Sequence, residues 1–212
     1  MTETIGGITI PDSQLAAAVT EYTRETANSL LFHHSRRVYL FGTLQGANRG
    51  LKADPELLYT GAMFHDIGLT TGYANSQRRF EVDGADAAAT FLLGQGLSQE
   101  DIRRVWLSIA LHTTPGVPEF LDPEIALVTA GVETDVLGID LHELNQSSID
   151  DVVNHHPRPN FKQEILQAFD DGNTRRPDTT FGNVNSDVLA HFNPDFVRTN
   201  FVDVILGSTW PE

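Results

Sequence analysis

The 212-residue sequence contains no cysteine. Disulfide bonds, thiolate metal sites and cysteine nucleophiles are therefore excluded, and any chemistry has to use oxygen and imidazole groups. Basic residues are also scarce, because 14 lysines and arginines face 29 aspartates and glutamates, which gives a formal net charge of −15. Nucleic acids and anionic lipids carry the same sign of charge, so the composition argues against both as nonspecific partners.

Long apolar segments are absent as well. No uninterrupted apolar run reaches the roughly 18 residues of a membrane-spanning helix, and the first residues, MTETIGGITIPDSQ, lack a basic stretch followed by an apolar run. We therefore expect a cytoplasmic protein. The hydrophobic content of 40% is ordinary for a globular fold, and no linker rich in proline, glycine and serine divides the chain. The sequence predicts a single domain over residues 1–212.

Helical periodicity dominates the chain, and capping residues mark most of the expected helix ends. Asp12 is predicted to cap the first helix, whereas Gly46 and Gly50 are expected to break the second. Further helices are predicted at about 28–44, 55–68, 80–93, 98–112, 122–138, 160–169, 185–192 and 195–206, with a loop at 170–183. Strand patterns are scarce apart from ITI at 8–10. The predicted fold class is all-α, with a core of about 28–140 and a helical extension of about 141–212 packed on it.

Two histidines and two carboxylates on three of these predicted helices are candidate metal ligands. His65 and Asp66 end the apolar helix GAMFHD. His34 lies on the same inward-facing side of its own helix as the apolar residues four and seven positions later. Asp135 lies in an apolar helix, where an unpaired carboxylate would be costly to bury. The four side chains could complete one site. For the His65–Asp66 pair, a hydrogen-bonded core histidine beside a turn-forming aspartate is the alternative interpretation.

The order His, His-Asp, Asp along the chain resembles the HD-domain superfamily of metal-dependent hydrolases. HSRRV at 34–38 is similar to the first motif of that family, HDIG at 65–68 to its second, and the helix that carries Asp135 to its last. The resemblance implies an HD-type helical bundle. It also implies that the metal ligands are His34, His65, Asp66 and Asp135.

Three further segments are similar to the cyanamide hydratase branch of this superfamily: FEVDGADAA at 80–88, LSIALHTT at 107–114 and PRPNFK at 157–162. This resemblance implies a hydro-lyase that hydrates a small nitrile, cyanamide, to urea. The implied cofactor is Zn²⁺, although Fe²⁺ or another divalent transition metal also suits histidine and aspartate ligands. A metal-bound hydroxide would attack the nitrile carbon, and protonation of the imidate nitrogen would follow.

Three residues are expected to take part in this chemistry beyond holding the metal. Asp66, or else Asp135, could relay the proton of the metal-bound water. His112 could donate a proton or orient the substrate, whereas the alternative is a histidine that interacts with the dipole of its helix end. Glu81 could orient a ligand or the substrate, whereas the alternative is an acid that is simply favourable in a first helical turn.

Two departures from other HD branches guide the choice of function. Many HD phosphohydrolases carry a lysine soon after the His-Asp pair, but Leu69 stands there in this sequence. Binuclear members commonly have a further histidine where this chain has Phe80. A phosphate substrate and a second metal are therefore disfavoured. The alternatives are an HD phosphohydrolase of a nucleotide or other phosphate ester, an iron oxygenase, and a non-catalytic helical protein that binds a metal or small ligand. The expected partner is a small-molecule substrate, with pairing into a homodimer possible.

Overall fold

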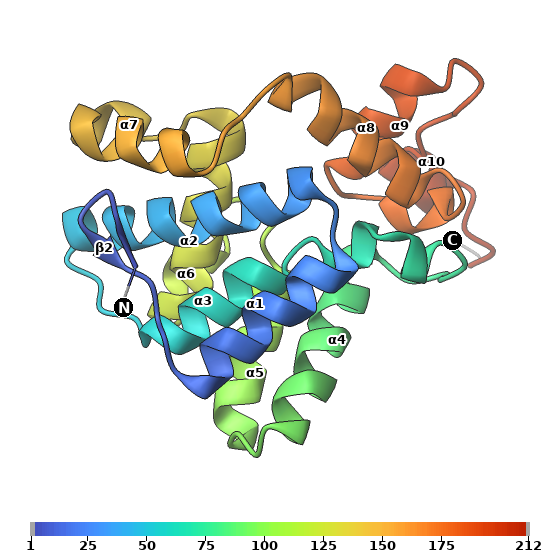
Figure 1. The fold of residues 1–212 in the computed structure, drawn as a ribbon. Coiled ribbons are helices and arrows are strands. Elements are labelled where there is room, and N and C mark those ends of the chain that lie inside the picture. The colour runs from blue at the N-terminus through green and yellow to red at the C-terminus, as the bar shows by residue number, and fades with distance from the viewer. Residues whose placement is uncertain (1–2, 211–212) are drawn as a thin grey trace.

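The computed structural model describes residues 3–210, and these residues confirm the all-α prediction (Figure 1). The helices are α1 (Gln14–Thr26), α2 (Ser29–Arg49), α3 (Pro55–Phe64), α4 (Phe80–Gly94), α5 (Gln99–Ala110), α6 (Pro123–Val132), α7 (Gln146–His155), α8 (Phe161–Asn173), α9 (Asn185–Phe192) and α10 (Phe201–Leu206). Two short antiparallel strands, β1 (Thr4–Ile5) and β2 (Ile8–Thr9), precede α1, with Thr4 opposite Thr9 and Ile5 opposite Ile8.

The ends of the first two helices differ from the expectation in ways that local contacts explain. The cap of α1 is Ser13 and not Asp12, because the Ser13 side chain accepts a hydrogen bond from the Ala16 backbone N–H. Helix α2 continues through Gly46 and ends at Gly50, whose φ of 67° is left-handed. Gly46 instead allows Leu127 to pack closely against α2, since a Cβ there would lie 2.7 Å from a methyl group of Leu127.

The core of the bundle depends on a close crossing of α2 and α6, which pack extensively against each other. A Cβ at Gly131 of α6 would lie 2.1 Å from the Val38 carbonyl oxygen, and one at Gly42 of α2 would lie 2.5 Å from the Leu127 carbonyl oxygen. Only glycine permits two helix backbones to approach this closely. The crossing brings the helix of His34 against the segment that holds Asp135.

Three helices end earlier than predicted, and each end carries a candidate site residue. Helix α5 ends at Ala110, two residues before His112. Helix α3 ends at Phe64, so that His65 caps it and Asp66 opens the short 3-10 turn Ile67–Leu69. Helix α6 ends at Val132 and continues as a π-helical turn, Glu133–Leu137, which contains Asp135. Irregular helical turns of this kind often occur at functional sites, because they aim a side chain differently from a regular helix.

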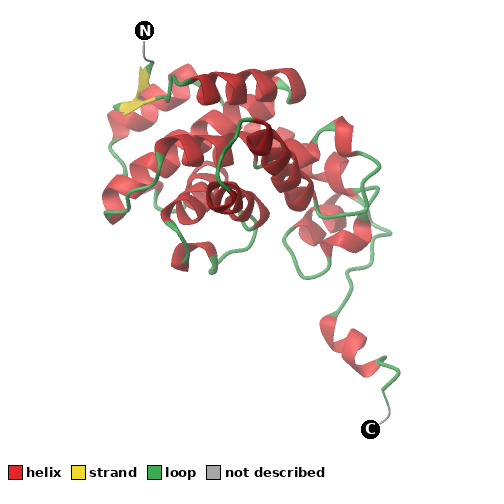
Figure 2. Cartoon of the chain, turned by 90° about the horizontal axis from the view of Figure 1, so that it is seen from below, coloured by secondary structure: helices red, strands yellow, loops and turns green. Residues whose placement is uncertain are grey.

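The C-terminal extension is more helical at its start than predicted and less so at its end. Helix α7 was not predicted, α8 runs four residues into the expected 170–183 loop, and the expected 195–206 helix is confined to α10. Helix α8 packs on α2 and on the turn after Asp66. By contrast, α10 extends away from the other helices (Figure 2) and exposes apolar side chains. The expected pairing of two copies stays a prediction, as does the single-domain boundary.

Within the described part of the chain, no helix has both the length and the apolar character that crossing a membrane requires.

The α2–α6 crossing generates a stability prediction. We expect Gly131→Ala to lower the free energy of unfolding by about 3 kcal/mol, because the new methyl group would overlap the Val38 backbone. The matched control is Gly94→Ala at the end of α4, where no atom lies within 4 Å of the added Cβ; this change should be neutral or slightly stabilising. Urea denaturation of the three proteins checks the prediction, and equal stability of both variants would contradict it.

Candidate metal centre

Three of the four expected ligands converge in the interior of the bundle. The ligand atoms of His34, His65 and Asp66 all lie within 4.8 Å of one another, and each residue is at most 2% exposed. The His65 Nε2 atom lies 3.2 Å from both His34 Nε2 and Asp66 Oδ2, and His34 Nε2 lies 3.6 Å from Asp66 Oδ2. Ligands about 2.1 Å from a tetrahedral ion are about 3.4 Å apart. The spacing of these three groups therefore suits one ion.

The other ring nitrogen of each histidine determines which nitrogen faces this cluster. The Nδ1 of His34 lies 2.7 Å from Asp135 Oδ2, and the Nδ1 of His65 lies 2.7 Å from the Ala62 carbonyl oxygen. The Nδ1 of His112 lies 2.6 Å from the Ile109 carbonyl oxygen. Because a carboxylate or carbonyl oxygen can only accept here, Nδ1 carries the proton and donates it in all three rings. In the neutral form of each ring, Nε2 keeps the lone pair that binds metal in proteins.

Asp66 and His112 leave buried acceptor atoms without hydrogen-bond donors. Both carboxylate oxygens of Asp66 and the Nε2 of His112 have no hydrogen-bond partner among residues 3–210. Burial acts to raise the pKa of Asp66, but positive charge on the neighbouring His65, His112 and His34 lowers it well below its usual range, so the carboxylate is ionised when a cation lies beside it. An ionised carboxylate buried without a donor is costly. A divalent cation would satisfy it, so the residues present fit a metal.

His112 comes from the segment just after α5, and its Nε2 lies 3.5 Å from Asp66 Oδ1. Its ring packs edge-on against His65, at 4.9 Å between centroids, and against Phe80. His112 therefore lies beside the cluster, with its Nε2 facing Asp66. Its catalytic role stays a prediction.

Asp135 lies behind His34 and outside the three-residue cluster. Its carboxylate accepts hydrogen bonds from His34 Nδ1 and from Arg37, whose Nε and Nη2 are 2.8 and 3.0 Å away. Arg158 forms an ion pair with it at 3.1 Å and donates to its backbone carbonyl. Burial would raise the pKa of Asp135, but the bonds from His34 and Arg37 overcome this and lower the pKa to about 2. In this arrangement Asp135 orients His34, and its role as a direct ligand stays a prediction.

Glu81 lies deep in the first turn of α4, fully buried. Its Oε1 accepts hydrogen bonds from Arg79 at 2.9 Å, from Asn185 at 3.2 Å and from the hydroxyl of Thr113, the neighbour of His112. Burial raises the pKa of Glu81, but the Arg79 bonds and the adjacent His112 more than compensate, so that the pKa is lowered. An ionised Glu81 with several donors fits an orienting function, which stays a prediction.

The sequence analysis missed several contributions from the C-terminal extension. His156 is 6% exposed, and its Nε2 accepts a hydrogen bond from Arg36 at 3.3 Å. Its Nδ1 lies 3.0 Å from the Nδ1 of His33. The backbone carbonyls of His156 and Pro157 both accept from Arg37. These hydrogen bonds hold the segment between α7 and α8 against α2. The PRPNFK segment, noted as a family resemblance, was the one signal that pointed to Arg158.

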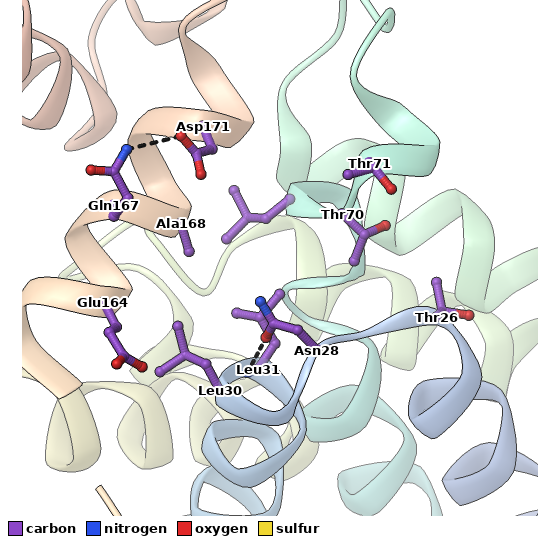
Figure 3. Close-up of a pocket in the computed structure, with 11 residues that line it drawn as sticks. Thr26, Asn28, Leu30, Leu31, Thr70, Thr71, Glu164, Gln167, Ala168 and Asp171 are labelled. Atoms are coloured by element: carbon purple, nitrogen blue, oxygen red, sulfur yellow. Dashed lines mark hydrogen bonds between the residues drawn. The ribbon is translucent and has the colours of Figure 1, made fainter. Parts of the chain in front are cut away.

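A pocket of about 440 Å³ adjoins the segments that carry His34 and Asp66 (Figure 3). It lies between the start of α2, the turn after Asp66, and α8. Leu31 and Leu69 line the pocket and also belong to an apolar cluster with Phe80, Phe161 and Ile165. The Phe161 ring contacts His34, with 5.3 Å between ring centroids. An apolar wall therefore separates the pocket from the ligands.

The comparison with known protein families agrees with this geometry. A model of the HD domain matches residues 31–163, which is more than half of the chain and includes every candidate ligand. No curated protein matches the sequence significantly.

The first prediction from this centre concerns metal content. We expect Asp66→Ala to weaken Zn²⁺ binding by more than the roughly 10- to 100-fold that loss of an outer partner causes, because it removes a ligand. The control is Asp86→Ala, an aspartate of α4 that is paired with Arg78 near the surface. Metal analysis after dialysis against buffered Zn²⁺ measures both variants. Retention of zinc by Asp66→Ala at the parent's level would refute the assignment.

The second prediction concerns His156 and pH. Burial, Arg36 and His33 lower the pKa of His156 from 6.5 to about 3. The unfolded chain therefore binds a proton below pH 6.5 that the folded protein excludes, and stability falls as the pH drops from 6.5 toward 3. His156→Gln should reduce this slope by on the order of 1 kcal/mol per pH unit, whereas exposed His191→Gln should not change it. Denaturation midpoints between pH 7 and 4 test this, and identical slopes in all three proteins would contradict it.

Proposed function

The chain belongs to the HD-domain family of metal-dependent hydrolases, and from this premise we propose that it hydrates a small neutral nitrile, cyanamide, to urea. The proposed metal is Zn²⁺, with Fe²⁺ or another divalent transition metal as alternatives for the same ligands. The proposed metal ligands are His34, His65, Asp66 and Asp135. Asp66, His112 and Glu81 are the proposed catalytic residues.

The observation that carries this proposal is the acidic and apolar lining of the pocket next to the metal centre. Leu31 and Leu69 of this pocket belong to the apolar cluster whose Phe161 ring contacts His34. The carboxylates of Glu164 and Asp171 also line the pocket (Figure 3). A phosphate ester bound in this pocket would face these like charges and would exchange its hydration for apolar side chains. A small uncharged molecule is neither repelled by these carboxylates nor strongly hydrated.

The arginines around the metal centre already form ion pairs with acidic side chains of the protein itself. Arg37 and Arg158 pair with Asp135, and Arg79 pairs with Glu81. A phosphohydrolase site usually offers cationic side chains to the phosphate oxygens. Paired guanidinium groups are poor candidates for that task, which supports a neutral substrate.

A divalent ion at His34, His65 and Asp66 would supply Lewis acidity, lowering the pKa of coordinated water toward about 7. Asp66 Oδ1, with no donor of its own, can accept the proton of the attacking water. His112 Nε2, which is 3.5 Å from that oxygen, can pass a proton to the nitrile nitrogen. The net change is the addition of one water molecule across the carbon–nitrogen triple bond, so both residues regain their starting protonation.

A phosphohydrolase is the second candidate, favoured by the family itself, whose members are metal-dependent hydrolases. It would use the same ligands. The two candidates differ in substrate charge, so one preparation of zinc-loaded protein can be tested against both.

We expect the zinc-loaded protein to form urea from cyanamide and to leave nucleotides and p-nitrophenyl phosphate intact. His112→Gln should lower kcat by about 100- to 10,000-fold, because a positioned proton carrier contributes that much, while zinc content stays unchanged. Exposed His191→Gln is the control. Colorimetric urea and phosphate assays give both readouts. Phosphate release without urea formation would replace the proposed function with the second candidate.

A further inference from the structure

Asn185 of α9, late in the chain, contacts Glu81, one of the proposed catalytic residues. Its side chain is buried, and its Nδ2 donates to Glu81 Oε1 at 3.2 Å across 104 residues of sequence. Glu81 also accepts from Thr113, which directly follows His112. Asn185 is therefore connected to the proposed catalytic histidine through a short chain of buried contacts.

The orientation of the Asn185 amide follows from this contact. A carboxylate oxygen accepts only, so the NH₂ group of Asn185 must face Glu81 and the carbonyl oxygen must face away. That oxygen, Oδ1, is buried and has no hydrogen-bond partner among residues 3–210. Leaving a buried acceptor unpaired costs free energy, which favours a ligand that brings a donor.

Among Asp66, Glu81, His112, Thr113 and Asn185, the buried side-chain atoms without a partner in the described part of the chain are acceptors. They are both carboxylate oxygens of Asp66, the Nε2 of His112 in its inferred tautomer, and Asn185 Oδ1. A cation can satisfy Asp66, and the substrate nitrogen is the expected partner of His112. Asn185 Oδ1 remains, and it requires an N–H or O–H donor.

The position of Asn185 is held firmly by the segment that precedes α9. Arg176, buried in that segment, donates to the Gly68 carbonyl oxygen at 2.7 Å and pairs with Asp83 of α4. Gly68 belongs to the turn that follows Asp66. The same guanidinium group therefore ties the α8–α9 connection to the metal-ligand turn and to α4, the helix that carries Glu81.

We propose that Asn185 is a specificity-determining residue whose Oδ1 accepts a hydrogen bond from an amino group of the substrate, next to the carbon that is attacked. The inference rests on the proposed function for the reaction and goes beyond it in selecting the substrate class. Cyanamide carries such an amino group, whereas acetonitrile has a methyl group of similar size without a donor. A site with a buried acceptor discriminates against the analogue that cannot pair with it.

The test compares zinc-loaded parent, Asn185→Ala and the control Asn193→Ala, an exposed asparagine that follows the same helix. Two measurements are made on each protein: kcat/KM for cyanamide and acetonitrile, and the affinity for urea and acetamide by ligand-observed NMR. Zinc content and the melting temperature establish that each variant is folded and loaded. Asn185→Leu, which preserves volume without an acceptor, replaces Asn185→Ala if the latter does not fold.

We expect the parent to prefer cyanamide over acetonitrile and urea over acetamide. In Asn185→Ala, kcat/KM for cyanamide and the affinity for urea should each fall about tenfold, the effect of one hydrogen bond. The kcat/KM for acetonitrile and the affinity for acetamide should stay unchanged. Asn193→Ala should behave like the parent. Equal losses toward the amino and methyl compounds, or a parent that does not discriminate between them, would overturn the proposal. Discrimination between urea and acetamide that depends on Asn185, without any hydration of cyanamide, would uphold this role and overturn the hydratase function instead.

Discussion

The hydrogen bond between His34 Nδ1 and the Asp135 carboxylate, 2.7 Å long, sets the chemistry of the whole centre. It fixes the proton on Nδ1, and so Nε2 presents its lone pair toward His65 and Asp66. The bond requires a buried charged carboxylate, which Arg37 and Arg158 stabilise from the other side. It also requires that the π-helical turn containing Asp135 reach α2, a contact that the glycine-lined crossing of α2 and α6 permits.

The C-terminal extension is a structural part of this centre as well as a cover for it. Arg158 completes the charge balance at Asp135, Phe161 packs on the His34 ring, and Asn185 reaches Glu81. Each of these contacts lies on a different element after residue 157. The three clustered ligands of this centre are at most 2% exposed, and such burial strengthens the electrostatic interactions between them.

Helical periodicity and capping residues predicted most of the bundle, because each of those signals depends on neighbours within a few positions. The family resemblance located His34, His65 and Asp66 on one site. The burial of His156 could not be predicted, because it depends on Arg36, which is 120 residues away in sequence. Asn185 was missed for the same reason. A polar residue in a weakly patterned region acquires meaning only when a distant helix such as α4 packs against it.

The most direct test of this account is anomalous X-ray diffraction at the metal edge from crystals of the protein loaded with Zn²⁺. The account predicts one strong peak per chain, about 2.0–2.2 Å from His34 Nε2, His65 Nε2 and an oxygen of Asp66. The same map shows whether Asp135 binds the ion directly or only forms its hydrogen bond to His34. A peak that does not touch Asp66, or the absence of any peak in this cluster, would contradict the central claim that these three side chains form a metal centre.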